Sequence, residues 1–206
     1  MLSLTYDDAV ERARDLAESS ERLILGVTGQ PGAGKSTLAA ALAEALPGSV
    51  VLGMDAFHLA HSTLIARGWV DRKGAIHTFD ADGYISMLRR VRQGEPRVIW
   101  APEFRRDVED AIAGAVPIEP TTGVVITEGN YLLATDPPWP EVAELCDEIW
   151  YLDIPEELRM RRLTARHVFF GRSAREAWRR TNGSDGTNAG LVARTRDRAT
   201  ATITVG

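Results

Sequence analysis

The chain has 206 residues, of which 44% are hydrophobic and 26% are charged, and this balance predicts a single globular domain over 1–206 with a core of its own. A formal net charge of -5 argues against nucleic acid as the main partner, and a single cysteine excludes an internal disulfide. No apolar run approaches the roughly 20 residues of a membrane span, and the first residues lack a signal-peptide pattern. We therefore expect a cytoplasmic protein with no membrane partner.

The N-terminal part of the chain predicts a helix, a strand, a loop and a second helix. Between Thr5 and Ser19, apolar residues recur at helical spacing among charged ones, and Thr5 is suited to cap this helix. Leu23–Val27 is a short apolar run that predicts a buried strand, and it ends at a glycine-rich turn. An Ala- and Leu-rich helix is then expected over Ser36–Leu46, followed by a second buried strand over Val50–Met54.

The rest of the chain alternates between helical and strand-like segments. Helices are predicted at Ala81–Arg92, Pro155–Phe170 and Ser173–Arg180, and strands at Arg97–Trp100, Val124–Thr127, Glu148–Leu152 and Thr200–Val205. A polar stretch, Thr181–Asn188, precedes the last strand, which we expect to close the sheet. Such alternation predicts an α/β fold with a mostly parallel sheet, helices on both faces and functional groups at the carboxyl ends of the strands.

A phosphate-binding motif lies between the first predicted strand and the following helix. The pattern G-x-x-x-x-G-K-[ST] is satisfied by Gly29, Gln30, Pro31, Gly32, Ala33, Gly34, Lys35 and Ser36, and Thr37 adds a second hydroxyl. The glycines let the backbone turn its N–H groups toward phosphate oxygens at a helix N-terminus. Lys35 supplies charge for the β- and γ-phosphates, and Ser36 is placed to bind Mg²⁺. The motif predicts nucleotide binding, but GTPases, ATPases, kinases and switches share it.

Two carboxylates follow predicted strands at the same edge of the sheet. Asp55 comes directly after Val50–Met54, where it could accept the proton of an attacking hydroxyl or assist in binding Mg²⁺. Glu128 ends the strand that begins at Val124, and it resembles a Walker B acid that holds Mg²⁺. The plain alternatives are a turn or capping aspartate and an ordinary charge at a strand end.

An ordered set of motifs extends beyond the phosphate loop. It comprises Met54-Asp55-x-Phe57-His58, Thr78-Phe79-Asp80, Pro102-x-Phe104, Thr127-Glu128-Gly129-Asn130-Tyr131 and Arg159-x-x-Arg162-x-x-x-Arg166. Together with the phosphate loop, this set resembles the uridine kinase, pantothenate kinase and phosphoribulokinase superfamily, from about Leu23 onward. Within it, the chain is similar to bacterial nucleoside/nucleotide kinase-like proteins and to kinases assigned to sugar operons.

The resemblance implies a three-layer P-loop fold with a small helical lid, at about 159–188, and an ATP- and Mg²⁺-dependent phosphotransferase. It implies Asp55 as the base, Lys35 and Ser36 as phosphate and metal contacts, and Glu128 as the second acid. The chain departs from uridine kinases because the segment Pro102–Glu109 has no histidine and because His77 stands where they often carry an acid. Arg105 and its neighbour Arg106 are expected instead to face an anionic or polyhydroxylated acceptor.

Arginines crowd the predicted lid. Spacing of three and four residues places Arg159, Arg162 and Arg166 on one helical face, where a negative partner would relieve their repulsion. We predict that Arg166 and Arg172 stabilise charge on the transferred phosphoryl group. The alternative is a solvated basic surface that pairs with nearby glutamates. The resemblance implies that the polar stretch 182–188 borders the adenine.

The acceptor pocket is expected near Asp55. Candidate substrate contacts are His58, His77, Phe79, Arg105 and Tyr131, with surface positions or core packing as the alternatives. The predicted reaction is transfer of the ATP γ-phosphoryl group to a hydroxyl of a small metabolite such as a sugar, a nucleoside or a vitamin-like alcohol. The rival interpretations are a nucleotide-dependent switch or regulatory ATPase, and a non-catalytic regulator. A homodimer is compatible with the sequence, which does not name the acceptor.

Overall fold

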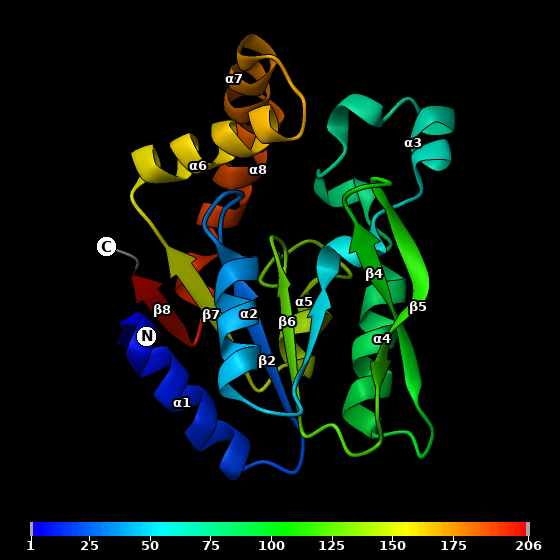
Figure 1. The fold of residues 1–206 in the computed structure, drawn as a ribbon, viewed down its shortest axis with the longest axis vertical. Coiled ribbons are helices and arrows are strands. Elements are labelled where there is room, and N and C mark those ends of the chain that lie inside the picture. The colour runs from blue at the N-terminus through cyan, green and yellow to red at the C-terminus, as the bar shows by residue number, and fades with distance from the viewer. Residues whose placement is uncertain (1, 205–206) are drawn as a thin grey trace.

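Six parallel strands form the central sheet of the structure, a computed structural model that describes residues 2–204 (Figure 1). Their order is β1-β8-β7-β2-β6-β3, with bounds Leu2–Leu4, Ala201–Thr204, Glu148–Asp153, Leu23–Thr28, Val124–Gly129 and Val50–Gly53. β2 lies between β6 and β7 and is buried along its whole length, which explains its unbroken apolar sequence. The predicted parallel α/β sheet is confirmed.

Helices cover both faces of this sheet and complete three layers. On one face, α1 (Tyr6–Glu18) and α2 (Lys35–Ala45) bury Ala9, Ala13, Leu38, Ala39 and Leu42 against the strands. On the other face lie α4 (Ala81–Gln93), α5 (Pro140–Leu145) and α8 (Ser184–Ala193), which contribute Tyr84, Ile85, Leu88, Val142 and Val192. The two apolar clusters hold the sheet rigid, so that the loops at its carboxyl edge start from fixed points.

The N-terminus differs in part from the sequence-based expectation. Thr5 caps α1 as predicted, because its hydroxyl accepts from the backbone N–H of Asp8 while the Asp8 carboxylate accepts from the N–H of Thr5. The three residues before it form β1, which was not predicted because so short a strand shows no alternation. β8 joins the sheet as expected, but β1 lies outside it at the edge, and Val205 falls outside the described residues.

The segment predicted as a strand at Arg97–Trp100 does not join the main sheet. It starts β4 (Ile99–Arg105), which pairs only with the unpredicted β5 (Asp110–Ile118) in a two-stranded antiparallel sheet. Burial alternates along β4, and Trp100 is 58% exposed, as expected of a strand covered on one face. β5 was not predicted because it carries Gly114 and Pro117, and glycine and proline are depleted in strands.

The polar stretch at Thr181–Asn188 is helical rather than irregular. α6 (Glu156–Phe169) leads to α7 (Ala174–Asn182), and α8 begins at Ser184 after Gly183 ends α7. Burial of Ala189 and Val192 stabilises α8 despite its polar first turn. Within residues 2–204, no helix has the length and apolar character that crossing a bilayer requires.

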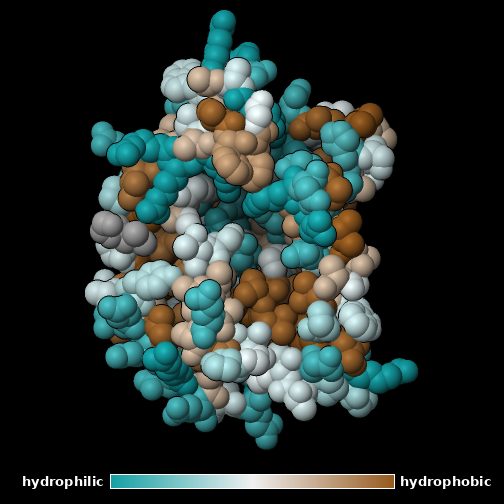
Figure 2. Space-filling model, viewed as in Figure 1, coloured by the Kyte–Doolittle hydropathy of each residue, from teal (hydrophilic) through white to brown (hydrophobic). Residues whose placement is uncertain are grey.

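The elements that follow the strands gather above the carboxyl edge of the sheet. α6 and α7 lie over one side of this edge, and α3 (His61–Arg67) and the tip of the β4–β5 hairpin lie over the other (Figure 1). The surface is hollowed between these two groups, and hydrophilic side chains surround the hollow (Figure 2).

Candidate active site

The loop of residues 29–34 joins β2 to α2 and needs glycine where other chain segments approach it. Gly32 has φ of 87°, and a Cβ there would lie 3.0 Å from the carbonyl oxygen of Arg159. A Cβ on Gly29 would lie 2.8 Å from the carbonyl oxygen of Leu152. The loop is therefore wedged against β7 and α6, and its backbone N–H groups open toward the hollow at the start of α2.

Lys35 lies under this loop and is only 8% exposed. Its Nζ donates hydrogen bonds to the carbonyl oxygen of Gly29 at 3.0 Å and to Oδ1 of Asn130 at 2.7 Å. Burial lowers the pKa of Lys35 to about 8, against an opposing effect of the Glu128 and Asp55 carboxylates. A bound polyphosphate would restore the charged form, so the side chain is poised to respond to an anion.

Ser36 and Glu128 meet as the motifs predict. The Ser36 hydroxyl donates to Oε1 of Glu128 at 3.0 Å, across the gap between α2 and the end of β6. Burial, and then the nearby Asp55 carboxylate, raise the pKa of Glu128. A Cβ on Gly129 would lie 2.5 Å from Cβ of Met54, so glycine allows β6 to pass close beneath the segment that carries Asp55.

These oxygen groups suit Mg²⁺ held together with phosphates. Mg²⁺ prefers oxygen ligands and usually takes one or two carboxylates while substrate phosphates supply further ligands. Ser36, Glu128 and Asp55 offer a hydroxyl and two carboxylates at one place, and all three line the same cavity. Among residues 2–204 no group of three or more His, Cys, Asp or Glu could hold a metal without such help. The donor set fits an ion that arrives with a nucleotide.

Two cavities meet in the hollow. The first, here called the P-loop cavity, measures about 510 Å³ and is lined by Gly34, Lys35, Ser36, Thr37, Glu128 and Arg162 among others. The second, the lateral cavity, measures about 460 Å³ and extends under α3 and the hairpin. Both are lined by Pro31, Asp55, Arg106, Asn130, Arg166 and Phe170. Asp55, in the short helix Met54–Phe57 after β3, thus stands at their boundary, 3.6 Å from Nη2 of Arg106.

The basic face of α6 turns toward the loop, but its members differ. Arg159 is 2% exposed, donates from Nη1 to the carbonyl oxygen of Pro31 at 3.0 Å, and pairs with Glu156. Arg162 lines the P-loop cavity, and Arg166 lines both cavities. Arg172, after the end of α6, lines only the lateral cavity. Arg159 therefore anchors α6 to the loop, while the other three remain available to ligands.

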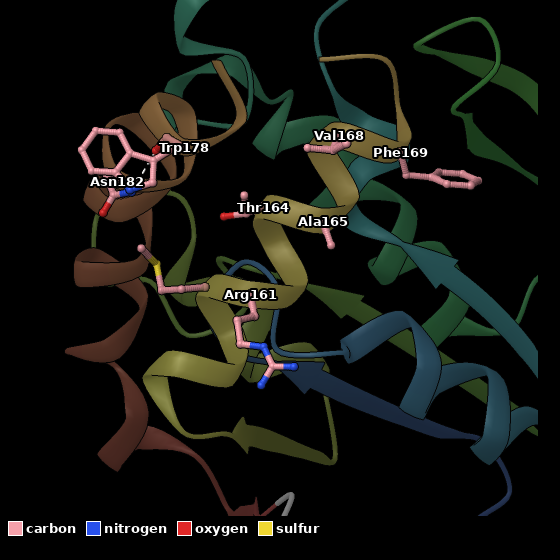
Figure 3. Close-up of a pocket in the computed structure, with 8 residues that line it drawn as sticks. Arg161, Thr164, Ala165, Val168, Phe169, Trp178 and Asn182 are labelled. Atoms are coloured by element: carbon pink, nitrogen blue, oxygen red, sulfur yellow. Dashed lines mark hydrogen bonds between the residues drawn. The ribbon is translucent and has the colours of Figure 1, made fainter. Parts of the chain in front are cut away.

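A larger groove of about 760 Å³ lies on the opposite side of α6 and carries none of these groups. Figure 3 shows that its walls come from α6 and α7, with Arg161 and Trp178 among them. Its lining is mostly apolar and holds no carboxylate, so it offers neither a base nor a metal ligand. This groove is larger than either cavity in the hollow. The groups that could bind phosphate, a metal ion or a hydroxyl lie in the hollow, so we place the candidate site there.

The structure places three of the predicted acceptor contacts at or beside the lateral cavity. The rings of His58 and Phe79 stack with centroids 3.9 Å apart, and both residues line the cavity. Burial lowers the pKa of His58, which favours its neutral form. Tyr131 lies behind them, 1% exposed, and donates to the carbonyl oxygen of Gly74 at 2.7 Å. It supports the wall rather than forming its surface.

The other two predicted contacts lie elsewhere, which corrects their expected placement. His77 packs edge-on against Trp69 and lines a separate depression beside Trp139. Arg105 pairs with Asp107 in solvent, whereas the next residue, Arg106, faces both cavities. Neighbouring residues at the end of a strand point to opposite sides, so a shift of one position decides which arginine reaches the site.

Several residues of the site were not given a role from the sequence. Asn130 holds Lys35, and its place directly after Glu128-Gly129 at a strand end could have indicated it. Lys73 and Arg180 line the lateral cavity from segments with no local motif. Asn188, expected near an adenine, instead donates to the carbonyl oxygen of Gly74 and lines the lateral cavity.

Comparison with known proteins accords with this geometry. No family model matches the chain. A protein of Schizosaccharomyces pombe, provisionally named a uridine kinase, is 34% identical over 91% of this chain and 85% of its own length. The chain belongs to the uridine kinase, pantothenate kinase and phosphoribulokinase superfamily of P-loop kinases. The resemblance inferred from the motifs is confirmed, and this P-loop kinase is a phosphotransferase that acts on an alcohol group.

Two further matches agree with this membership. The crystal structure of a protein provisionally named a fructose transport system kinase, from Silicibacter sp. TM1040, has a TM-score of 0.86 and 32% identity, and the match covers 97% of this chain and 98% of that one. A pantothenate kinase of Chelativorans sp. (strain BNC1) is 30% identical over 66% of this chain, which spans 46% of that enzyme's length. The P-loop kinase fold is thus shared along nearly the whole chain.

Proposed function

We propose that this P-loop kinase transfers the γ-phosphoryl group of ATP to a hydroxyl of a small metabolite bound in the lateral cavity. The observation that carries the proposal is the position of Asp55, which lines both cavities at the place where they meet. A triphosphate on the P-loop would end at this boundary, and a hydroxyl entering from the lateral cavity would reach the same point. The arrangement supports in-line transfer between two ligands rather than hydrolysis at a closed nucleotide site.

Each side chain has a role that follows from its place. The Asp55 carboxylate orients the acceptor hydroxyl and takes its proton as the new phosphate ester forms. Arg106, 3.6 Å away, holds that carboxylate and adds positive charge. Lys35 and Arg166, which both line the P-loop cavity, stabilise the charge of the phosphates. Ser36 and Glu128, with Asp55, would hold Mg²⁺, which neutralises phosphate charge when the nucleotide is bound.

Replacing Asp55 tests this proposal. In Asp55→Asn, turnover should fall by about 10²- to 10⁴-fold because the general base is lost, while the affinity for ATP stays largely intact. The measurement is ADP release with Mg²⁺-ATP and a panel of hydroxylated metabolites, together with nucleotide titration. Asp107→Asn is the matched control, since Asp107 is exposed and lies outside both cavities.

The same assay separates a kinase from a switch. ADP release that depends on an added metabolite, and a phosphorylated product, support the proposal. Hydrolysis of the same rate with and without every metabolite, or unchanged turnover in Asp55→Asn, would contradict it.

A further inference from the structure

Two arginines line the lateral cavity but not the P-loop cavity. Arg172, between α6 and α7, and Arg180, on α7, line the lateral cavity and are absent from the lining of the P-loop cavity. Neither makes an ion pair with a carboxylate anywhere in residues 2–204. Arg180 donates one hydrogen bond, to the carbonyl oxygen of Lys73 at 3.3 Å, which holds the guanidinium at the wall. Neither guanidinium group therefore has an ion-pair partner within residues 2–204, and neither lines the P-loop cavity.

Most of the acidic groups around this cavity are already engaged. Glu109 pairs with Lys73 at 3.5 Å, and Asp185 lies 2.6 Å from Nε2 of His167. Asp55 has Arg106 beside it. Asp71 is the one carboxylate of the described lining without an ion pair. Counted over Lys, Arg, Asp and Glu alone, the lining holds five cations (Lys73, Arg106, Arg166, Arg172 and Arg180) and four carboxylates (Asp55, Asp71, Glu109 and Asp185), so the cavity carries one excess positive charge in a chain whose net charge is -5.

Arg172 and Arg180 belong to a different part of the lateral cavity from Asp55. Asp55 marks the end of the cavity where the hydroxyl must react, whereas Arg172 and Arg180 belong to the α7 side and contribute nothing to the P-loop cavity. Phe79 and Phe104 supply apolar wall in the same cavity, whose volume of about 460 Å³ suits a small metabolite. Guanidinium groups match carboxylates and phosphates in shape and charge, and they gain most where water is partly excluded.

We infer that the acceptor is a hydroxyl compound that also carries a carboxylate or phosphate group, and that Arg172 and Arg180 bind this anionic group. The inference rests on the proposed function, because it assumes that the lateral cavity takes the acceptor. The hydroxyl meets Asp55 while the anionic group lies at the α7 side, so the ligand spans the cavity. A neutral sugar or nucleoside leaves the two guanidinium groups without a partner.

Matched pairs of acceptors test the charge requirement. Each pair shares its hydroxyls and differs in the anionic group: glycerate with glycerol, pantothenate with panthenol, and ribose 5-phosphate with ribose. With Mg²⁺-ATP, kcat/KM should be at least about tenfold higher for the anionic member of any pair that is phosphorylated. Comparison of the two carboxylate pairs with the phosphate pair then shows which anionic group the site binds. Equal or higher kcat/KM for the neutral member would overturn the inference while leaving the kinase proposal standing.

Variants connect the preference to the two arginines. Arg172→Gln and Arg180→Gln should each raise the KM for the anionic acceptor about 10- to 100-fold, with the KM for ATP and kcat changed little. Neutral acceptors should respond to neither change. Arg175→Gln is the control, because Arg175 lies on the same helix and lines neither cavity. Wild-type KM values in both variants would contradict the inference.

A binding measurement tests, without catalytic turnover, whether Arg172 and Arg180 bind an anion. Inorganic phosphate is titrated calorimetrically into protein saturated with a non-hydrolysable Mg²⁺-ATP analogue, whose γ-phosphate group occupies the phosphate position beside Lys35. Binding to the wild type and to Arg175→Gln, and its loss in the double variant Arg172→Gln/Arg180→Gln, supports the inference. No binding to the wild type, or equal binding to the double variant, overturns it. Melting temperatures of all variants, measured alongside, identify any that fail to fold, and in that case the single variants replace the double one.

Discussion

The P-loop cavity and the lateral cavity differ in how their charges are satisfied. In the first, Lys35 already has three oxygen partners and Ser36 is bonded to Glu128, so these two residues of the loop motif are paired before any ligand arrives. In the second, Arg172 and Arg180 form no ion pair with a carboxylate among residues 2–204. The comparison indicates that the protein itself pairs Lys35 and Ser36 of the loop motif, whereas on our proposal Arg172 and Arg180 obtain their counter-charge from the acceptor.

The largest effect should come from breaking the prepared side. Lys35→Met removes the buried charge that faces the phosphates, and turnover should fall by about 10²- to 10³-fold or more. The loss should be the same for every acceptor, because this residue does not line the lateral cavity. Steady-state kinetics with two unlike acceptors check this. A loss that depends on the acceptor would mean that the two cavities do not divide their tasks as described.

A second variant weakens the connection between the loop and α6. Arg159→Met removes the hydrogen bond to the Pro31 carbonyl and the pair with Glu156, so the free energy of unfolding should fall by about 1–3 kcal/mol. Denaturant unfolding measures this change. Arg161→Met is the control on the same helix and should stay within about 0.5 kcal/mol, since Arg161 is exposed and lines only the outer groove. Equal decreases in the free energy of unfolding of the two variants would show that Arg159 does not anchor α6 to the loop.

The smallest effect concerns pH. Because burial lowers the pKa of Lys35 to about 8, the free protein loses this charge as the pH rises through that value. Phosphates bind the charged form, so the dissociation constant for a non-hydrolysable ATP analogue should rise above pH 8, by at most about tenfold per pH unit. Calorimetric titrations between pH 7 and 9.5 measure it. In Lys35→Met this rise should be absent, and its persistence would assign the titration to another group.

The sequence predicted those parts of the site that depend on local pattern. The loop at 29–36 and the acids at 55 and 128 each follow a buried strand, and parallel strands bring their carboxyl ends to one edge. Their convergence thus follows from the fold class alone. The roles of Asp55 and Arg166 in the reaction stay predictions, of which Asp55→Asn tests the first, whereas Arg172, which lines only the lateral cavity, is now proposed to bind the acceptor instead of the transferred phosphoryl group.

The remaining parts depend on relations between distant segments. The β4–β5 hairpin was not predicted because nothing in Ile99–Arg105 indicates which strand will pair with it. His77 and Arg105 have the right residue types, but side-chain direction at a chain turn or a strand end changes with a shift of one residue. Arg180 reaches the site only because α7 folds back over the sheet, which no short motif records.

The separate hairpin has a consequence for how such an enzyme could change over time. β4 and β5 pair only with each other, and their core contribution is limited to a few residues such as Ile99, Ala101 and Ile118. Insertions or exchanges near Glu109, at the hairpin tip beyond Arg106, leave the register of β2, β3 and β6 undisturbed. If the lateral cavity takes the acceptor as proposed, acceptor preference can therefore change by mutation in this hairpin without a change in the strands that carry the P-loop, Asp55 and Glu128.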